Sequence, residues 1–330
     1  MRLVITTTSG YRVITFSDAR LKSWDSKKGE YVTRKASLLK KGDFYRFWLG
    51  DDRTVTWNCE LPPPPQMNVR AKVYRLPVKM NSLVAEFFGL MVADGTIYQS
   101  GFRLTKSHED VVDRFEGLCI ALFSVKTKRF MHGNAFACEV NSTYIRAWLE
   151  CVGGLAAKQK RIPAGVLRSS KESTQSAFLC GLFEDGTVNI KKGRLDHVGF
   201  TTAYEDMART VQLMLLRLGI ISSVIETVSR GNHHWRVSVY GYNATLFADR
   251  IGFISAVKNA QLRTPAGPEN RYLIPVDGST VGEVEGKPWV RRNALNRGYV
   301  SRDAARQLGM LDELKFHHER IESITKGGDA

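Results

Sequence analysis

Two apolar helical stretches in this chain each end abruptly on an acidic residue followed by a glycine. The first is Leu83–Gly95 and the second is Ala177–Gly186. An ionised carboxylate at the tip of a buried helix is costly unless another group pairs with it. Either stretch alone could be an ordinary core helix that ends in an Asp-Gly turn. Two of them, each followed by the same pattern, indicate a duplicated unit built around a pair of acid-tipped helices.

The pattern that follows each stretch predicts strands and two further helices. After Gly95, apolar and polar residues alternate over 102–105, which is typical of a half-buried strand with one polar face. A helix with one apolar stripe, more strands and a third helix ending near Gly153 come next. The same order recurs after Gly186 and ends near Gly252. We therefore predict an α+β fold with one repeat over 67–172 and a second over 173–265.

The two ends of the chain differ from these repeats. Residues 1–66 contain short β-rich runs and finish in the prolines Pro62 to Pro65, which are expected to mark a boundary. The C-terminal segment covers 266–330. We expect the two end segments to pair into one small β-rich domain.

The charge of the chain favours a polyanionic partner. Lys and Arg number 48 against 33 Asp and Glu, a formal net charge of +15, which is typical of proteins that bind nucleic acid. The five cysteines form no C-x-x-C pair, as expected for reduced thiols in a cytoplasmic protein. With no signal peptide and no apolar run of bilayer length, no membrane association is expected.

Small residues on the first acid-tipped helix predict how the two helices meet. Gly89 and Ala93 leave one helix face bare, and Gly181 is the matching small residue in the second helix, so the partners can approach closely. Asp94 and Asp185 would then meet at the helix tips and repel each other unless a cation lies between them. Carboxylate oxygens suit Mg²⁺ or Mn²⁺, and a metal there can activate water near a phosphodiester.

These motifs resemble a known family. Phe87–Gly95 and Phe178–Gly186 resemble the paired signature of the LAGLIDADG homing endonucleases, and the segment 158–163 is similar to the Lys-x-Ile-Pro segment of intein-borne members. The resemblance implies a single-chain monomer with a duplicated αββαββα fold and internal pseudo-twofold symmetry. It also implies prokaryotic or phage origin, metal-dependent cleavage of both strands of a long DNA site, and a saddle of strands that reads the major groove.

The same resemblance assigns the candidate site. It implies a catalytic lysine near each centre, namely Lys160 through its Ile-Pro step and Lys258 by internal symmetry. Asp94 and Asp185 are implied to be catalytic and to bind the metal, and Gly95 and Gly186 are further candidate metal ligands. Basic residues of the strands and turns are the candidate DNA contacts: Arg103, Lys106, Lys126, Lys128, Arg129, Lys191, Lys192, Arg194, Arg230 and Arg236. The pairs His233-His234 and His317-His318 have no partner at zinc-site spacing and are expected to face solvent or DNA.

The second motif is one residue shorter than the first between its central glycine and its acid. One missing residue turns the next side chain by about 100° and removes about 1.5 Å of rise, so Asp185 cannot superpose on Asp94 if both helices stay regular. A tightened last turn can absorb the deletion. If it does not, the longer side chain of Glu184 is the alternative metal ligand.

The ends of the chain carry a second resemblance. Gly10–Asp18, Leu38–Asp43 and His318–Ile324 resemble parts of an intein splicing (Hint) domain. Asp18 stands where that family has its splicing histidine, and neither a Cys or Ser nucleophile at the start nor a terminal His-Asn is present, so we expect no complete splicing. Two alternatives to a nuclease stay open: a DNA-binding protein of the same fold that no longer cleaves, and a fragment of an intein. The segment Tyr299–Gly309 could serve a binding protein or could be a packing helix.

Overall fold

The duplicated unit is present in the computed structural model, which describes residues 1–50, 59–63, 65–66, 72–155, 160–229, 231–267, 271–282 and 287–327. The first copy consists of α1 (Ser82–Asp94), β6 (Thr96–Tyr98), β7 (Gly101–Lys106), α2 (Glu109–Phe123), β8 (Lys128–His132), β9 (Ala135–Val140) and α3 (Thr143–Val152). The second consists of α5 (Glu172–Phe183), β10 (Thr187–Lys191), β11 (Arg194–Thr202), α6 (Glu205–Arg217), β12 (Ser223–Ser229), β13 (Asn232–Tyr240) and α7 (Tyr242–Arg250). Both copies have the αββαββα order, so the predicted α+β fold class is confirmed. The short helix α4 (Ala164–Arg168) links them, and α8 (Ala256–Leu262) follows the second copy.

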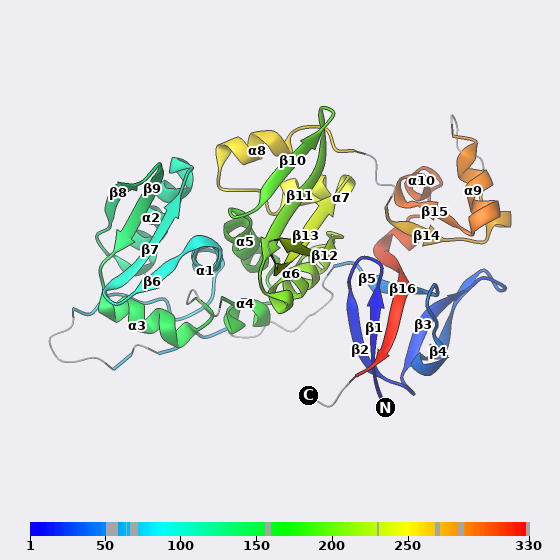
Figure 1. The fold of residues 1–330 in the computed structure, drawn as a ribbon, viewed down its shortest axis with the longest axis horizontal. Coiled ribbons are helices and arrows are strands. Elements are labelled where there is room, and N and C mark those ends of the chain that lie inside the picture. The colour runs from blue at the N-terminus through cyan, green and yellow to red at the C-terminus, as the bar shows by residue number, and fades with distance from the viewer. Residues whose placement is uncertain are drawn as a thin grey trace.

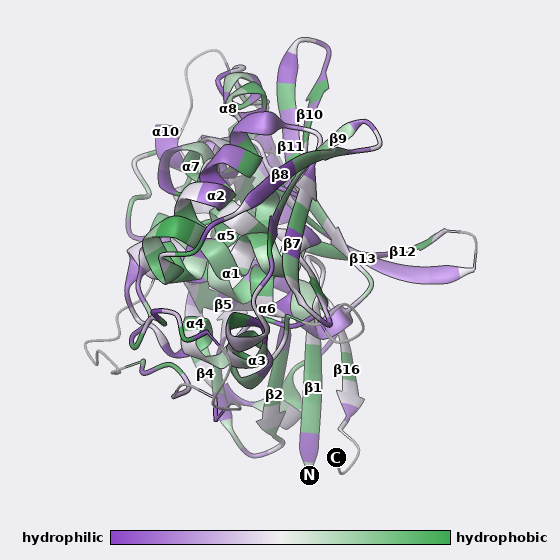
Figure 2. Ribbon diagram, turned by 90° about the vertical axis from the view of Figure 1, so that its left-hand side faces the viewer, coloured by the Kyte–Doolittle hydropathy of each residue, from purple (hydrophilic) through white to green (hydrophobic). Residues whose placement is uncertain are grey.

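Each copy contains one four-stranded antiparallel sheet, and the two sheets share the same strand order. These orders are β6-β7-β9-β8 and β10-β11-β13-β12. Apolar residues such as Phe102 and Leu104 of β7 and Val198 and Phe200 of β11 are buried against the helices. Seen from the side, the strands lie on one flank of the two copies and the helices on the other, and the β12–β13 hairpin reaches out beyond its sheet (Figure 2). One open face of strands is therefore formed by both copies.

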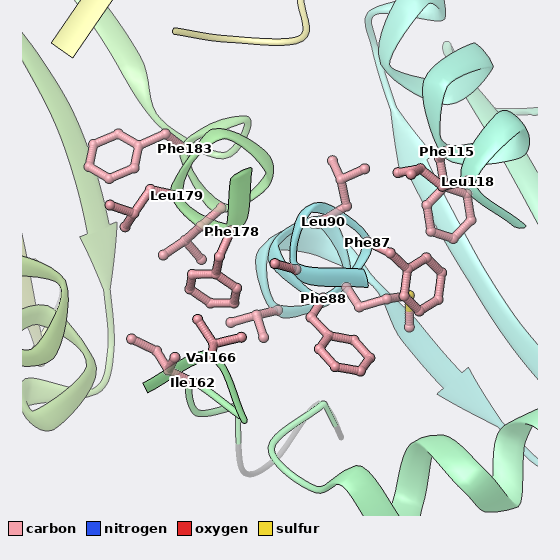
Figure 3. Packing of buried hydrophobic residues seen from close by; sticks show 14 of the residues in the cluster. Phe87, Phe88, Leu90, Phe115, Leu118, Ile162, Val166, Phe178, Leu179 and Phe183 are labelled. Carbon is pink, nitrogen blue, oxygen red and sulfur yellow. The ribbon is translucent and has the colours of Figure 1, made fainter. Parts of the chain in front are cut away.

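Helices α1 and α5 lie side by side between the two sheets and form the centre of the core. Phe87, Phe88 and Leu90 of α1 are fully buried, and so are Phe178 and Phe183 of α5. A single apolar cluster extends from these residues into both copies (Figure 3). Because this core is shared, the two copies form one body rather than two independent domains.

The first and last strands of the chain pair with each other, as expected from the sequence. A six-stranded sheet has the order β2-β1-β16-β5-β3-β4 (Figure 1). It comprises β1 (Arg2–Thr7), β2 (Arg12–Phe16), β3 (Arg20–Asp25), β4 (Glu30–Lys35), β5 (Phe44–Trp48) and β16 (Phe316–Lys326). β1 runs antiparallel to β16, with Val4 opposite Thr325. The resemblance of this sheet to a Hint domain stays a prediction, as do the domain boundaries.

A smaller unit lies between α8 and β16. It contains β14 (Leu273–Pro275), α9 (Trp289–Arg297), β15 (Tyr299–Ser301) and α10 (Arg302–Gln307), and it has its own apolar cluster. Ala304 and Ala305 of α10 belong to that cluster, which supports the interpretation of this segment as a packing helix. Short 3₁₀ helices occur at Ala36–Leu38, Gly278–Thr280 and Glu313–Lys315.

The turn between β1 and β2 joins the terminal sheet to the second copy. The Ser9 carbonyl oxygen accepts hydrogen bonds from the Val224 backbone N–H at 2.9 Å and from the Gln212 side chain at 2.8 Å. Gly10 has φ +84°, and a Cβ there would lie 2.7 Å from the Val224 carbonyl oxygen. Tyr11 is buried beside this turn. These hydrogen bonds fix the β1–β2 turn against β12 and α6.

The expectation that His317 and His318 face solvent or DNA is wrong. Their exposed fractions are 0% and 2%, because β16 lies inside the six-stranded sheet and is covered on both faces. The His318 ring lies 2.7 Å from the Tyr31 hydroxyl and 2.9 Å from the Glu313 carbonyl oxygen. Burial lowers the pKa of His318 to about 3, because the charged imidazolium loses its hydration there.

No helix in the described ranges is both long enough and apolar enough to cross a bilayer.

Candidate active site

The contact between α1 and α5 depends on a pair of glycines. A Cβ on Gly181 would lie 2.5 Å from the Glu86 carbonyl oxygen and 2.8 Å from the Leu90 nitrogen, both on α1. A Cβ on Gly89 would in turn meet the backbone of α5 at Phe178 and Leu182. Ala93, the third predicted interface residue, packs at the edge of the same apolar cluster. The reciprocal contact confirms the close approach predicted from Gly89 and Gly181, and it supports the pseudo-twofold axis, which stays a prediction.

The ends of the two helices differ, and the difference absorbs the missing residue of the second motif. α1 stays regular to its end, where the Gly95 N–H donates to the Met91 carbonyl four residues back. After α5, the N–H groups of residues 184, 185 and 186 each donate to the carbonyl three residues back. A turn of this tighter type advances the chain faster per residue. The tightened last turn considered from the sequence is therefore present.

Asp94 and Asp185 meet at the helix tips with a lysine ammonium between them. Lys106 Nζ donates a short hydrogen bond to Asp94 Oδ2 and lies 3.9 Å from Asp185 Oδ1. The two Asp side chains are 39% and 43% exposed, so the pair opens to solvent. Burial and the neighbouring Asp94 carboxylate raise the pKa of Asp185, opposed by Lys106. The pair therefore favours a cation between its carboxylates.

Lys160 and Lys258 take equivalent positions in the two copies. Lys160 Nζ donates to the carbonyl oxygen of Ala93 at 2.8 Å, and Lys258 Nζ donates to that of Glu184 at 2.6 Å. Each of these carbonyls belongs to the residue directly before an aspartate of the pair. Burial lowers the pKa of both lysines, and nearby carboxylates oppose the shift. The symmetry that suggested Lys258 is present in the geometry.

Two of the candidate metal ligands are already engaged by other groups. The Glu184 carboxylate is buried and accepts hydrogen bonds from the backbone N–H groups of Ile254 and Ser255. The Gly186 carbonyl oxygen accepts a hydrogen bond from Lys258 Nζ at 2.9 Å. The prediction of Glu184 as an alternative metal ligand is therefore wrong. The tightened turn brings Asp185 to the acidic pair and directs the Glu184 side chain into the protein interior. Gly95 follows Asp94 at the end of α1.

The donor set left at the centre is a pair of carboxylates. Within the described ranges, no group of three or more His, Cys, Asp or Glu side chains could hold a metal ion. Mg²⁺ commonly uses one or two protein carboxylates together with substrate phosphates and water. The exposed oxygens of Asp94 and Asp185 fit a cation of that kind, provided that the Lys106 ammonium gives way.

The open strand face of the first copy carries fewer basic side chains than predicted. Arg103 and Lys128 lie on this face, both opposite Glu139 in neighbouring strands and both near the Phe130 ring. Arg129 points to the other face, where it pairs with the acids Glu109, Asp113 and Glu116. Lys106 also points to the helix side and is only 8% exposed. The prediction that Arg129 and Lys106 contact DNA from the strand face is therefore wrong, since alternation along a strand places both side chains on the helix side of the sheet.

The second copy places its basic residues at a hairpin tip and on the open face. Lys191, Lys192 and Arg194 are exposed at the β10–β11 turn. Arg236 lies in β13 opposite Thr201 and Ile225, two exposed residues of the flanking strands. Lys126 is exposed in the connection before β8. Arg230 lies outside the described residues.

Sequence reasoning missed a polar group on the open face of the second copy. His197 of β11 lies 2.7 Å from Asp196 and 3.1 Å from the Asn189 amide, and its ring packs near Tyr240. The register between β10 and β11 shifts at this point, so no simple alternation marks His197, and two of its neighbours, Asn189 and Tyr240, come from other strands. The helix-side position of Lys106 had a clearer signal in the sequence, because Lys106 follows Phe102 and Leu104 at every second position of β7 and so lies on the same face.

The fold and site define a class: a single chain with two αββαββα units whose central helices meet at an acidic pair below an open strand face. Residues 173–252 match the family model described as a LAGLIDADG-like domain. This part of the chain is therefore a LAGLIDADG-like domain, and the first copy repeats its topology.

The chain spans less than a third of the length of the curated relatives that it matches. It is 25% identical over 225 residues to a component of the A-type ATP synthase of Pyrococcus abyssi, covering 67% of this chain and 21% of that protein. It is 32% identical over 148 residues to replicative DNA helicase DnaB of Rhodothermus marinus, covering 40% and 16%. It is 26% identical over 315 residues to the replication factor C small subunit of Methanocaldococcus jannaschii, covering 91% and 15%.

Solved structures resemble the chain over half of its length or more. A structure of the homing endonuclease I-DmoI has a TM-score of 0.40 and 16% identity, covering 52% of this chain and 90% of that one. Full-length DUF199/WhiA from Thermatoga maritima has a TM-score of 0.40 and 12% identity, covering 71% and 89%.

Proposed function

We propose that this chain is a site-specific endonuclease that binds duplex DNA and cuts both strands with the help of Mg²⁺ or Mn²⁺. The observation that carries the proposal is the meeting of Asp94 and Asp185 at the tips of two tightly packed helices. Such a pair gathers negative charge at one exposed point, where a divalent cation and a phosphate group can both approach. Close packing of the two helices through Gly89 and Gly181 fixes the positions of their tips relative to each other.

The side chains around the pair take distinct roles. Asp94 and Asp185 would hold the cation, which would supply an activated water and neutralise charge on the phosphodiester. Lys160 and Lys258 hold the backbone directly before the two aspartates, because they donate hydrogen bonds to the carbonyl oxygens of Ala93 and Glu184. Their partly buried ammonium groups also add positive charge beside the phosphate position.

The open strand face supports binding of duplex DNA. Antiparallel strands can enter the major groove, and alternate residues then face the bases. Arg103, Lys128 and Arg236 lie on that face, and the β10–β11 tip carries three further basic residues. The net charge of +15 is consistent with many phosphate contacts.

One observation favours a second candidate, a DNA-binding protein that does not cleave. The Lys106 ammonium already lies at the acidic pair and neutralises part of its charge. If the Lys106 ammonium stayed bound to the two carboxylates at all times, the protein would keep the fold and the open strand face but would bind no metal. Cleavage itself separates the two candidates.

The test is a selection of sites from a random duplex library, with binding and cleavage scored separately in Mg²⁺ or Mn²⁺. We expect bound sites to be cut on both strands, with one strand cut more slowly because the two copies differ around the acids. Asp94→Asn and Asp185→Asn should keep binding and lose cutting. Asp113→Asn, which changes an acid of α2 paired with Arg129, is the matched control and should keep both. Enrichment of bound sequences without any cut would remove the nuclease proposal and leave the binding protein.

A further inference from the structure

Lys106 is the one basic side chain that we expected at the DNA and that the structure places at the acidic pair. It ends β7 on the helix side of the sheet, in line with the buried Phe102 and Leu104. Its ammonium contacts Asp94 and lies 3.9 Å from Asp185, so it is shared between carboxylates of the two copies. A buried lysine with two acidic neighbours from different repeats has a more specific position than a solvated surface lysine.

The other two lysines of the site do not have the same position. Lys160 and Lys258 donate to backbone carbonyls rather than to the aspartates. The residue of the second copy that corresponds to Lys106 is Thr202, which also ends the second strand of its sheet. Its hydroxyl lies 3.6 Å from the Met207 sulfur and carries no charge. Among the residues that the structure describes, a single ammonium therefore lies near both acids.

We propose that Lys106 is an internal counter-cation that holds Asp94 and Asp185 together in the absence of a divalent ion and competes with that ion for their oxygens. The inference rests on the proposed metal site. Two carboxylates at one point repel each other, and the ammonium relieves that repulsion. A lysine is a compact point charge on a flexible stem, so it can leave the acids without movement of the strand.

A consequence is that metal and DNA favour each other's binding. A divalent ion that takes the two carboxylates releases the ammonium, and a DNA phosphate then offers it a new partner. DNA that attracts Lys106 frees the carboxylates for metal in the same way. Coupling of this kind is reciprocal, with each ligand raising affinity for the other by the same factor.

The first measurement needs no metal. In chelator, Asp94→Asn should lower the melting temperature of the wild-type protein, because it removes a partner of Lys106. In a Lys106→Met background the same change should raise it, because it removes an unshielded repulsion. This reversal of sign in a double-mutant cycle reports the counter-cation role directly. If the melting-temperature shifts of the Asp94 and Lys106 substitutions simply add, the counter-cation role of Lys106 is overturned.

The second measurement is Mn²⁺ titration of the DNA-free protein by calorimetry. Lys106→Met should bind Mn²⁺ about 10-fold more tightly than wild type, within the usual range of coupling between sites. Lys126→Met, which changes an exposed lysine of the neighbouring connection, is the control and should match wild type. Lys106→Gln takes the place of Lys106→Met in both measurements if the latter does not fold.

The outcomes separate this inference from the proposed function. Equal or weaker Mn²⁺ binding by the Lys106 variant, including no binding by either protein, overturns the competition. Loss of cleavage in the library selection overturns the nuclease proposal and leaves the metal-free cycle unaffected. A reversal of sign in that cycle together with tighter Mn²⁺ binding supports the inference.

Discussion

Replacing Gly181 with alanine should separate the two central helices and destabilise the whole core. The added Cβ would lie 2.5 Å from the Glu86 carbonyl oxygen and 2.8 Å from the Leu90 nitrogen, and both are backbone atoms of α1 that no rotamer change can move away. A normal contact at this point needs more than 3 Å, so α1 and α5 must shift apart by roughly half an ångström or more.

The expected magnitude follows from two opposing effects. Overpacking against backbone costs about 3 kcal/mol, at the upper end of the usual range. Alanine is a better helix former than glycine and returns about 1 kcal/mol. The net loss is therefore about 2 kcal/mol, which corresponds to a fall in melting temperature of roughly 4–8 °C for a domain of this size.

The matched control is Gly117→Ala on α2. Gly117 is also helical, but a Cβ there meets no atom within 4 Å. Only the propensity gain applies, so this variant should melt about 2–4 °C higher than wild type. Differential scanning calorimetry on both variants gives the comparison. A Gly181→Ala protein that melts at or above the wild-type temperature would show that the helices are not held by glycine contact.

Two further predictions concern the terminal sheet and the open strand face. Because the pKa of His318 is about 3 when folded and about 6.5 when unfolded, the folded state binds fewer protons in between. Stability is therefore complete above about pH 6.5 and should fall by about 2 kcal/mol between pH 7 and pH 5; urea unfolding should show this loss in wild type and not in His318→Gln. On the open face, Lys128→Ala and Arg236→Ala should each weaken duplex binding and reduce its salt slope by about one, whereas Arg129→Ala should leave binding unchanged, because its partners are acids of α2. Equal losses of binding for Lys128→Ala and Arg129→Ala would contradict this assignment of faces.

Local pattern was enough to predict the repeated unit and its central contact. The period of apolar residues marks α1 and α5, and small residues such as Gly89 mark the face that a partner can approach. These features follow from residues within one or two turns of each other. In β7 the prediction of Arg103 on the open face agrees with the alternation of the strand, whereas Lys106 was predicted as a DNA contact although the same alternation places it on the helix side.

The errors at the buried histidines and at Glu184 arose because the surroundings of these residues come from distant parts of the chain. His317 and His318 are buried because β16 pairs with β1 and β5, and those pairings bring together opposite ends of the sequence. Glu184 points inward because the backbone N–H groups of Ile254 and Ser255 meet its carboxylate. No pattern within a short window contains such partners.

The two copies share the same order of elements and differ in the charge that they place at the acidic pair. Each presents an aspartate whose preceding carbonyl is held by a lysine, so that arrangement follows from the duplicated fold. Only the first copy ends its second strand with a lysine, while the second copy ends it with Thr202. Duplication alone would place either two ammonium groups at the acidic pair or none. A single ammonium matches two carboxylates that must stay together without metal and yet keep net negative charge to attract it. The difference between the copies is therefore a feature of the site itself.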